Sequence, residues 1–379
     1  MRIEQRQWIA GAGWTPSPLP VSSRDFQLVL IFGHPGVLRE RSRMDEIRKA
    51  YPDACLTGCS TAGEIFSTRV QDGTISLTAV HFDHSSVQMA SAPSGGVGDS
   101  FETGRQLGGK LSPDGLVHVF VLSDGLNVNG TELVRGLADA LPGHVTITGG
   151  LAADGVAFRE TLVLADGVPQ KNIVSVTGFY GDRLKVGFGS LGGWDPFGPE
   201  RVVTRSSGNV LYELDNHSAL ALYKQYLGEH AAGLPATGLL FPLSMRTEDG
   251  QQSVVRTILS VDEKEGSMTF AGTIPQGSLA RLMKANFDRL IDGAIGAAEA
   301  GRQVLGAVSP DLAVLISCVG RKLILKQRIE EEVEGVRDVL GDKTPLTGFY
   351  SYGEISPFTM GAKCELHNQT MTITTFLED

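Results

Sequence analysis

A strand, a loop, a helix and a second strand that leads into a Thr-Gly pair follow one another three times along this chain. The first strands are apolar runs at 28–32, 116–122 and 312–316. The helical stretches cover 37–50, 131–141 and 327–340. The pairs are Thr57-Gly58, Thr148-Gly149 and Thr347-Gly348. Apolar strands joined by an amphipathic helix are typical of parallel βαβ crossovers, because helices cover both strand faces. An α/β protein with a repeated unit is therefore predicted.

Alternating patterns between these units predict added antiparallel strands at 74–82, 161–164, 173–180, 183–189, 253–261, 267–270 and 365–376. Further helices are predicted at 216–227 and 279–300, and the Gly- and Pro-rich segment 192–199 is predicted to be irregular. The chain is divided near residue 215, into 1–215 with two units and 216–379 with one. The expected fold has mixed sheets in two pseudo-repeated domains that share a cleft.

A nine-residue phrase ends the first and the third unit. Residues 57–65 and 347–355 agree in a Thr-Gly pair and a Gly-Glu-Ile triplet, and each copy brings a glutamate, Glu64 or Glu354. Two carboxylates in one cleft could accept hydrogen bonds from a ligand. Each glutamate could instead cap backbone amides of its own turn. The phrase is compatible with both uses.

The loops after the first strands contain further candidate ligand-binding residues. Asp124, Cys318 and Arg321 follow strands whose carboxyl ends lie at one edge of an open α/β sheet, where such folds bind ligands. Arg321 could hold a carboxylate by two parallel hydrogen bonds. Cys318 could be a ligand, a redox switch or a nucleophile if its pKa is lowered, or an inert core residue. Asp124 is either a contact or part of an Asp-Gly turn.

Histidines bear on a possible haem, because neutral imidazole is a common axial ligand. His34 lies in the first loop at this edge and His367 near the end of the chain, and a purely structural role is the alternative for each. No Cys-x-x-Cys-His sequence is present, so any haem would be bound without covalent attachment, as haem b.

The charge balance of the chain limits the kinds of partner that it can bind. The chain has 33 basic and 43 acidic residues and a net charge of -10, which disfavours nucleic acid and anionic membranes. No signal peptide and no apolar run of spanning length is found, and four cysteines are too few for a disulfide framework. A cytoplasmic, bacterial-type location is expected. The sequence has no Gly-x-Ser-x-Gly motif of serine hydrolases, no Gly-x-x-x-x-Gly-Lys-Ser/Thr phosphate-binding loop and no His-Glu-x-x-His zinc-binding helix. An enzyme is therefore not expected.

Several of these segments together resemble the FIST family, a two-part bacterial sensory module with FIST N and FIST C domains. The resemblance rests on 57–65, the turn 148–152, the loop 317–321, the segment 348–355 and the closing Leu366-His367-Asn368-Gln369-Thr370. It extends from about residue 26 to 376 and adds Asn368 to the candidate ligand-binding residues.

The resemblance implies ligand sensing in signal transduction, with amino-acid-like molecules as proposed ligands. A FIST protein without an attached output domain also resembles the nitric-oxide-sensing haem proteins of the family, which act on partner histidine kinases. A separate histidine kinase or other signalling protein is thus the expected partner. The alternative from another class is a thiol- or carboxylate-dependent enzyme that uses Cys318 or Glu354 on a small molecule.

Overall fold

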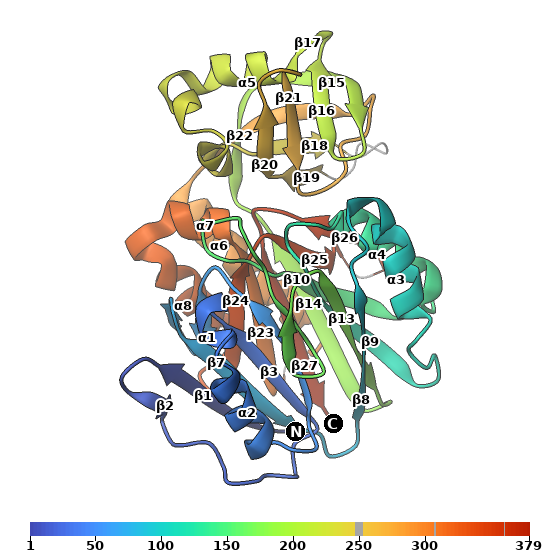
Figure 1. Ribbon diagram of the computed structural model, residues 1–379, viewed down its shortest axis with the longest axis vertical. Coiled ribbons are helices and arrows are strands. Elements are labelled where there is room, and N and C mark those ends of the chain that lie inside the picture. The colour runs from blue at the N-terminus through green and yellow to red at the C-terminus, as the bar shows by residue number, and fades with distance from the viewer. Residues whose placement is uncertain (247–252, 307, 360) are drawn as a thin grey trace.

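Each predicted unit forms the centre of its own sheet in the computed structural model, which describes residues 1–246, 253–306, 308–359 and 361–379 (Figure 1). The parallel pairs are β3 (Leu28–Gly33) with β4 (Cys55–Ser60), β9 (Leu116–Ser123) with β10 (Thr146–Leu151), and β23 (Leu312–Cys318) with β24 (Leu346–Ser351). The predicted mixed α/β fold with parallel βαβ units is confirmed.

The same antiparallel strands extend each parallel pair. β7 (Ile75–His81) and β1 (Arg2–Ile9) follow β3 in the first sheet, β13 (Ile173–Tyr180) and β8 (Ser86–Pro93) follow β9 in the second, and β27 (Met371–Glu378) and β14 (Leu184–Leu191) follow β23 in the third. Short strands complete the edges: β2 (Gly13–Thr15), β6 (Arg69–Gln71), β12 (Val168–Gln170) and β26 (Cys364–His367). The three sheets therefore share one strand order.

The units exchange strands in a closed ring. β5 (Glu64–Phe66) leaves the first unit and pairs with β24 of the third. β25 (Gly353–Pro357) leaves the third and pairs with β10 of the second, and β11 (Val163–Ala165) leaves the second and pairs with β4 of the first. The repeated phrase is thus the start of a crossing strand, and its Thr-Gly pair lies inside β4 or β24, where a turn was expected. The body is a ring of three units, two of which come from the N-terminal part.

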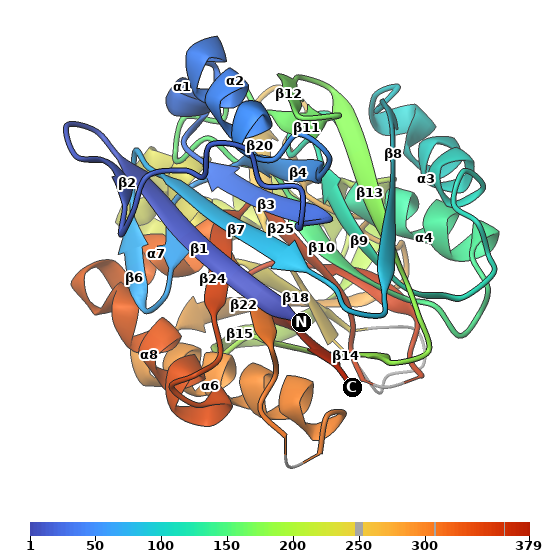
Figure 2. The ribbon, with the colours of Figure 1, turned by 90° about the horizontal axis from the view of Figure 1, so that it is seen from below.

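Helices cover the outer faces of the three sheets, while the inner faces meet in a common apolar core (Figure 2). In β3, Leu28, Leu30 and Phe32 point to this core, whereas Val29 and Ile31 pack toward α2. This alternation explains the continuous apolar run, because both strand faces are buried. The covering helices are α2 (Arg41–Ala50), α3 (Ser100–Gly108), α4 (Gly130–Ala140), α6 (Phe287–Gln303) and α8 (Ile329–Leu340). Two short helices, α1 (Pro35–Leu38) and α7 (Val319–Leu325), begin directly after β3 and β23.

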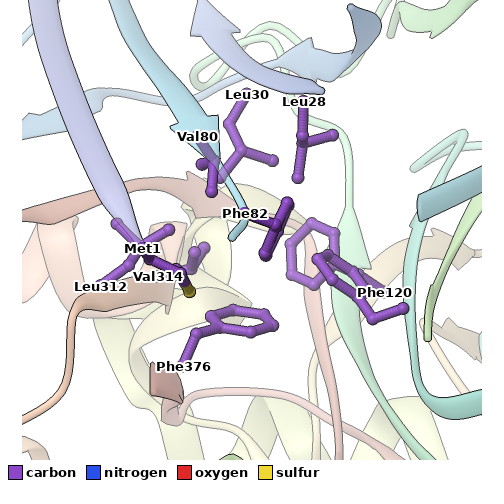
Figure 3. A pocket seen from close by; sticks show the side chains of 10 residues that line it. Met1, Leu28, Leu30, Val80, Phe82, Phe120, Leu312, Val314 and Phe376 are labelled. Carbon is purple, nitrogen blue, oxygen red and sulfur yellow. The ribbon is translucent and has the colours of Figure 1, made fainter. Parts of the chain in front are cut away.

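The core contains an enclosed apolar cavity, which Met1 and Phe376 line near the two chain ends (Figure 3). Its volume is ≈ 10 Å³, which is room for about one water molecule. The lining is apolar throughout: Met1, Leu28, Leu30, Val80, Phe82, Phe120, Phe179, Leu312, Val314 and Phe376. A cavity of this size and lining is a packing defect between the sheets and holds no metabolite.

A small β domain sits over one end of the ring (Figure 1). It contains β15 (Trp194–Ser207), β16 (Val210–Leu214), β17 (His217–Ser218), α5 (Ala219–Leu227), β18 (Leu243–Arg246), β19 (Ser253–Arg256), β20 (Ile258–Asp262), β21 (Ser267–Phe270) and β22 (Leu279–Ala285). Its apolar core is its own and includes Val203, Leu220 and Phe270. No helix within the described ranges is long and apolar enough to cross a membrane.

Two predictions fail in this domain. Segment 192–199, expected to be irregular, enters β15, and the first part of the helix expected at 279–300 is β22, which pairs with β15. The helix starts at Phe287 because the Asn286 side chain accepts a hydrogen bond from the Arg289 amide. The division expected at residue 215 falls between β16 and β17, inside the domain.

Candidate functional site

The carboxyl groups of Glu64 and Glu354 hold the exchanged strands in place by hydrogen bonds. We call each carboxyl group with its donors a clasp. Glu64 Oε2 accepts hydrogen bonds from the amide (2.9 Å) and the hydroxyl (2.8 Å) of Thr74, and Oε1 accepts one from Thr61. Glu354 Oε2 accepts from the amide (3.2 Å) and the hydroxyl (2.9 Å) of Thr370, and Oε1 accepts from Ser351 (2.5 Å). Both residues are almost fully buried.

The second unit lacks this clasp. Val163 of β11 pairs with Cys59, as Glu64 pairs with Phe349 and Glu354 with Gly150. An apolar residue thus stands where the other crossing strands have a carboxyl group. The expected cleft with two open carboxylates is not what the structure has, because both side chains are enclosed by the hydroxyl and amide groups of their own units.

Burial raises the pKa of Glu64 to about 7 and that of Glu354 to about 8, and the hydrogen bonds they accept lower these values only in part. A carboxyl group with a raised pKa in the folded state favours folding in its protonated form. Its contribution is complete below pH about 4.5 and is lost as the pH rises through the folded value. The clasps should therefore weaken between mildly acidic and mildly alkaline pH.

We expect the Glu354→Gln variant to remove part of this pH dependence. The amide keeps the shape but cannot ionise, so the variant should gain unfolding temperature relative to the native protein as the pH is raised from 5 to 9. Thermal unfolding at five pH values measures the difference. Glu299→Gln, at an exposed position of α6, is the control and should follow the native profile. A constant difference between Glu354→Gln and the native protein at all pH values would contradict the expected titration.

Arg321, predicted to hold a ligand carboxylate, is instead fully buried in a protein ion pair. Its Nε and Nη2 donate to Glu332 Oε2 at 3.0 and 2.7 Å. Nη1 donates to Gly192 O at 3.0 Å and Nη2 also donates to Leu290 O at 2.6 Å. Glu332 Oε1 accepts from Tyr350 at 2.6 Å. Arg321 therefore connects α7 with α6 and α8, and its hydrogen bonds are made within the fold.

Cys318 lies at the start of α7 and is buried. Burial raises the pKa of its thiol, the nearby Glu354 raises it further, and the Arg321 charge opposes this only weakly. A nucleophilic cysteine needs the opposite shift. The geometry matches the alternative of an inert core cysteine, because Arg321 is paired with Glu332 and does little to lower the pKa of the thiol.

Asp124 caps its own turn in the second unit. One carboxylate oxygen, Oδ1, accepts from the Leu126 amide at 2.8 Å and from the Thr161 hydroxyl at 2.7 Å. The side chain of Asn127 donates to the other oxygen at 3.2 Å. Asp124 is buried, and its hydrogen bonds match the second of the two expected roles, that of a residue that stabilises an Asp-Gly turn.

The sixth predicted ligand-binding position, Asn368, lies where the small domain contacts the ring. We call this contact the seam and define it by Arg256 and Thr257 of the small domain and Leu366, Asn368 and Gln369 of the ring. The Thr257 amide donates to Asn368 Oδ1 at 3.3 Å, and Gln369 Nε2 donates to Thr257 Oγ1 at 3.2 Å. Arg256 Nη1 donates to Leu366 O at 2.7 Å. Hydrogen bonds between polar groups thus connect the small domain to the ring at the seam.

Gln369 has the most unusual position in the seam. It is fully buried, has φ of 64°, and its carbonyl accepts from Trp194 Nε1 at 2.9 Å. A Cβ on Gly320 would come within 2.3 Å of its Oε1, so a larger residue at position 320 would displace the Gln369 side chain. Among the described residues, Oε1 has no hydrogen-bond donor.

Arg256, Thr257, Gln369 and Glu332 were missed by the sequence analysis. Arg256 follows Val254 by two positions in a predicted strand, which places a charge on the same strand face as an apolar residue. That break in alternation is a signal for a buried arginine. The other three have no comparable pattern. Thr257 and Gln369 contact each other across 112 positions of the chain, and Glu332 lies in a helix whose sequence has several other glutamates.

The two histidines expected to bind haem each have a hydrogen-bond partner within the fold. His34 caps α1, where its Nδ1 accepts from the Gly36 amide at 3.1 Å. His367 is buried with Nε2 at 2.9 Å from Ser356 O and its ring against Phe358, and burial lowers its pKa to about 4. The enclosed apolar cavity has no histidine and is far below the ~300 Å³ of small ligand pockets. Within the described residues, no group of three or more His, Cys, Asp or Glu could hold a metal ion.

Comparison with known proteins gives a family match. The FIST N domain model matches residues 27–217, and the FIST C domain model matches residues 219–357. No curated protein matches the sequence. Among solved structures, the crystal structure of a cyanuric acid hydrolase from A. caulinodans aligns with 93% of this chain and 90% of its own, at 8% identity and a TM-score of 0.38.

Proposed function

This chain belongs to the FIST family of sensory modules, and from that premise we propose that it binds a small polar metabolite at the seam and signals to a separate protein. An amino-acid-like ligand and a histidine kinase or other signalling protein are the proposed ligand and partner. Haem is not favoured, since His34 and His367 do not fit it. Cys318 gives an enzyme no support, since its thiol is buried and protonated.

The unpaired Oε1 of Gln369 carries the proposal. A buried acceptor without a donor costs about 1–3 kcal/mol, and a ligand with an N–H or O–H group would remove that cost. The amide lies between two parts of the protein, so a group bound there contacts both. A ligand with different contacts in the open and closed seam shifts the balance between them, which is what a sensor needs.

The architecture supports such a movement. The small domain is joined to the ring by two passages of the chain, one from β14 into β15 and one from β22 into α6. One side of the interface is apolar, with Trp194, Leu290 and Ile324, and the seam side is polar. Interfaces between domains of this mixed kind commonly allow relative motion.

The experiment is a thermal-shift titration of the full chain with the standard amino acids as probes. For any probe that stabilises the protein, intrinsic tryptophan fluorescence, to which Trp194 contributes with Trp8 and Trp14, is then measured. We expect at least one probe to raise the unfolding temperature of the native protein and not that of Gln369→Leu. The exposed Gln276→Leu in the small domain is the matched control and should keep the response. No response to any probe, together with no small molecule in native mass spectra of the purified protein, would refute the proposed function.

A further inference from the structure

We infer that the seam recognises an oxyanion group of the ligand, a carboxylate or a phosphate, through the guanidinium of Arg256. The inference rests on the proposed function, because it specifies the chemistry of the same seam.

Arg256 is a buried cation that has no hydrogen-bonded counter-ion in the part of the chain that the structure describes. It ends β19 and is only 3% exposed. Nη1 donates to Leu366 O at 2.7 Å and Nε donates to Thr273 O at 3.3 Å, both of which are neutral carbonyls. Among the described residues, Nη2 has no hydrogen-bond acceptor, and Glu365 Oε2 lies 4.0 Å away. Burying a charge is costly unless it is both paired and hydrogen-bonded.

The other fully enclosed arginine of the chain provides the comparison. Arg321 makes two hydrogen bonds of 2.7 and 3.0 Å to Glu332 and is neutralised within the fold. Arg256 has only carbonyl partners, although its burial is similar. A structural role therefore accounts for every contact of Arg321 but leaves the charge and Nη2 of Arg256 unused.

Glu365 is a weak counter-ion for this charge. Burial raises the pKa of its carboxyl group, while the charges of Arg256, Lys363 and Arg135 oppose the rise. Three cations thus surround one carboxylate. Burial lowers the pKa of Arg256 to about 10, so the guanidinium stays charged at neutral pH. The local charge is positive and favours an incoming anion.

The backbone around Arg256 adds to this preference. α4 begins at Gly130, and its Thr131 hydroxyl accepts from the Thr273 amide at 3.4 Å. A Cβ on Gly272 would lie 2.9 Å from Thr131 Oγ1 and 3.0 Å from Arg256 Nε, so the glycine lets the helix start and the guanidinium come close together. The amino-terminal end of a helix carries a partial positive charge. The Thr131 and Glu132 amides already donate to Asn129 Oδ1, and Glu132 lies in the first turn, so the helix contributes only its dipole and Arg256 is the main group that attracts an anion.

The test uses the full chain at constant ionic strength, with sodium acetate and inorganic phosphate as separate probes, sodium chloride as the balancing salt and acetamide as the neutral analogue of acetate. We expect acetate or phosphate to raise the unfolding temperature of the native protein and acetamide not to do so. The probe that acts shows which oxyanion the seam prefers. Arg256→Gln should weaken that response about tenfold or more, the loss expected for hydrogen bonds to a charged group.

Arg205→Gln is the matched control, because Arg205 is 51% exposed on the same domain and pairs with Glu213. It should keep the native response. Arg256→Lys keeps the charge but lacks the planar donors of arginine, so it should bind the oxyanion probe more weakly than the native protein. This variant replaces Arg256→Gln in the test if Arg256→Gln does not fold. Equal responses in native and Arg256 variants, or equal action of acetamide, would overturn the inference. If the oxyanions have no effect while an amino-acid probe still depends on Gln369, the inference fails and the proposed function stands.

Discussion

The Glu332→Gln variant is expected to lose about 3–5 kcal/mol of unfolding free energy, as in other proteins in which one partner of a buried ion pair is removed. Arg321 and Glu332 are both 0% exposed in their side chains. Glutamine cannot balance the guanidinium, which would remain in an apolar surrounding with its charge uncompensated. Urea denaturation followed by circular dichroism measures the loss.

Two further variants define the cause. The double variant Arg321→Met with Glu332→Met should be more stable than Glu332→Gln, because it removes both charges together. Glu102→Gln breaks the exposed pair of Glu102 with Arg105 on α3 and should leave the urea midpoint unchanged. An unfolding free energy of Glu332→Gln within about 1 kcal/mol of the native value would contradict a structural role for the pair.

The Gly348→Ala variant is expected to prevent folding or to cost more than about 3 kcal/mol, since overpacking against backbone cannot relax easily. A Cβ at this position would lie 1.8 Å from Leu315 O, and φ is 159°. The equivalent glycines have the same constraint: a Cβ on Gly58 would lie 1.8 Å from Ile31 O, and one on Gly149 would lie 1.9 Å from Val121 O. The Thr-Gly pair therefore repeats because parallel strands approach closely there.

Soluble expression and thermal unfolding test all three alanine variants. Gly143→Ala is the control, because nothing lies within 4 Å of its Cβ position and its φ is not positive. That variant should change stability by less than about 0.5 kcal/mol. Native-like stability of Gly348→Ala would mean that the repeated pair has a role other than close strand packing.

The sequence by itself was sufficient for the three repeated units. Their strands are buried on both faces, so their apolar runs contain only one polar residue, His118, and the pattern is clear. The Thr-Gly pairs mark one close approach in each unit. The strand 173–180 was predicted with the bounds of β13, since its alternation is local. The family resemblance and the family match also agree, because both depend on these short local motifs.

Only the tertiary structure decided what the conspicuous residues do. Glu64 and Glu354 were predicted to be near a cleft, but the strand exchange encloses them. That exchange depends on pairing between strands far apart in the sequence, such as β5 and β24, which are 283 positions apart at the centre of their ladder.

 The central pair of that ladder, Gly348 with Ile65, spans those 283 positions (348 − 65). Arg321 was predicted to bind a ligand, yet it forms a buried ion pair with Glu332 on the next long helix.

The small domain has the same explanation. Segment 192–199 looked irregular because its glycines and prolines weaken any local pattern, and it becomes the start of β15 by pairing with β22. Arg256 and Gln369 gain their importance from burial between this domain and the ring. Local periodicity therefore determined the repeated units, whereas the seam and the partners of its charges were decided by contacts between residues that are distant in the sequence.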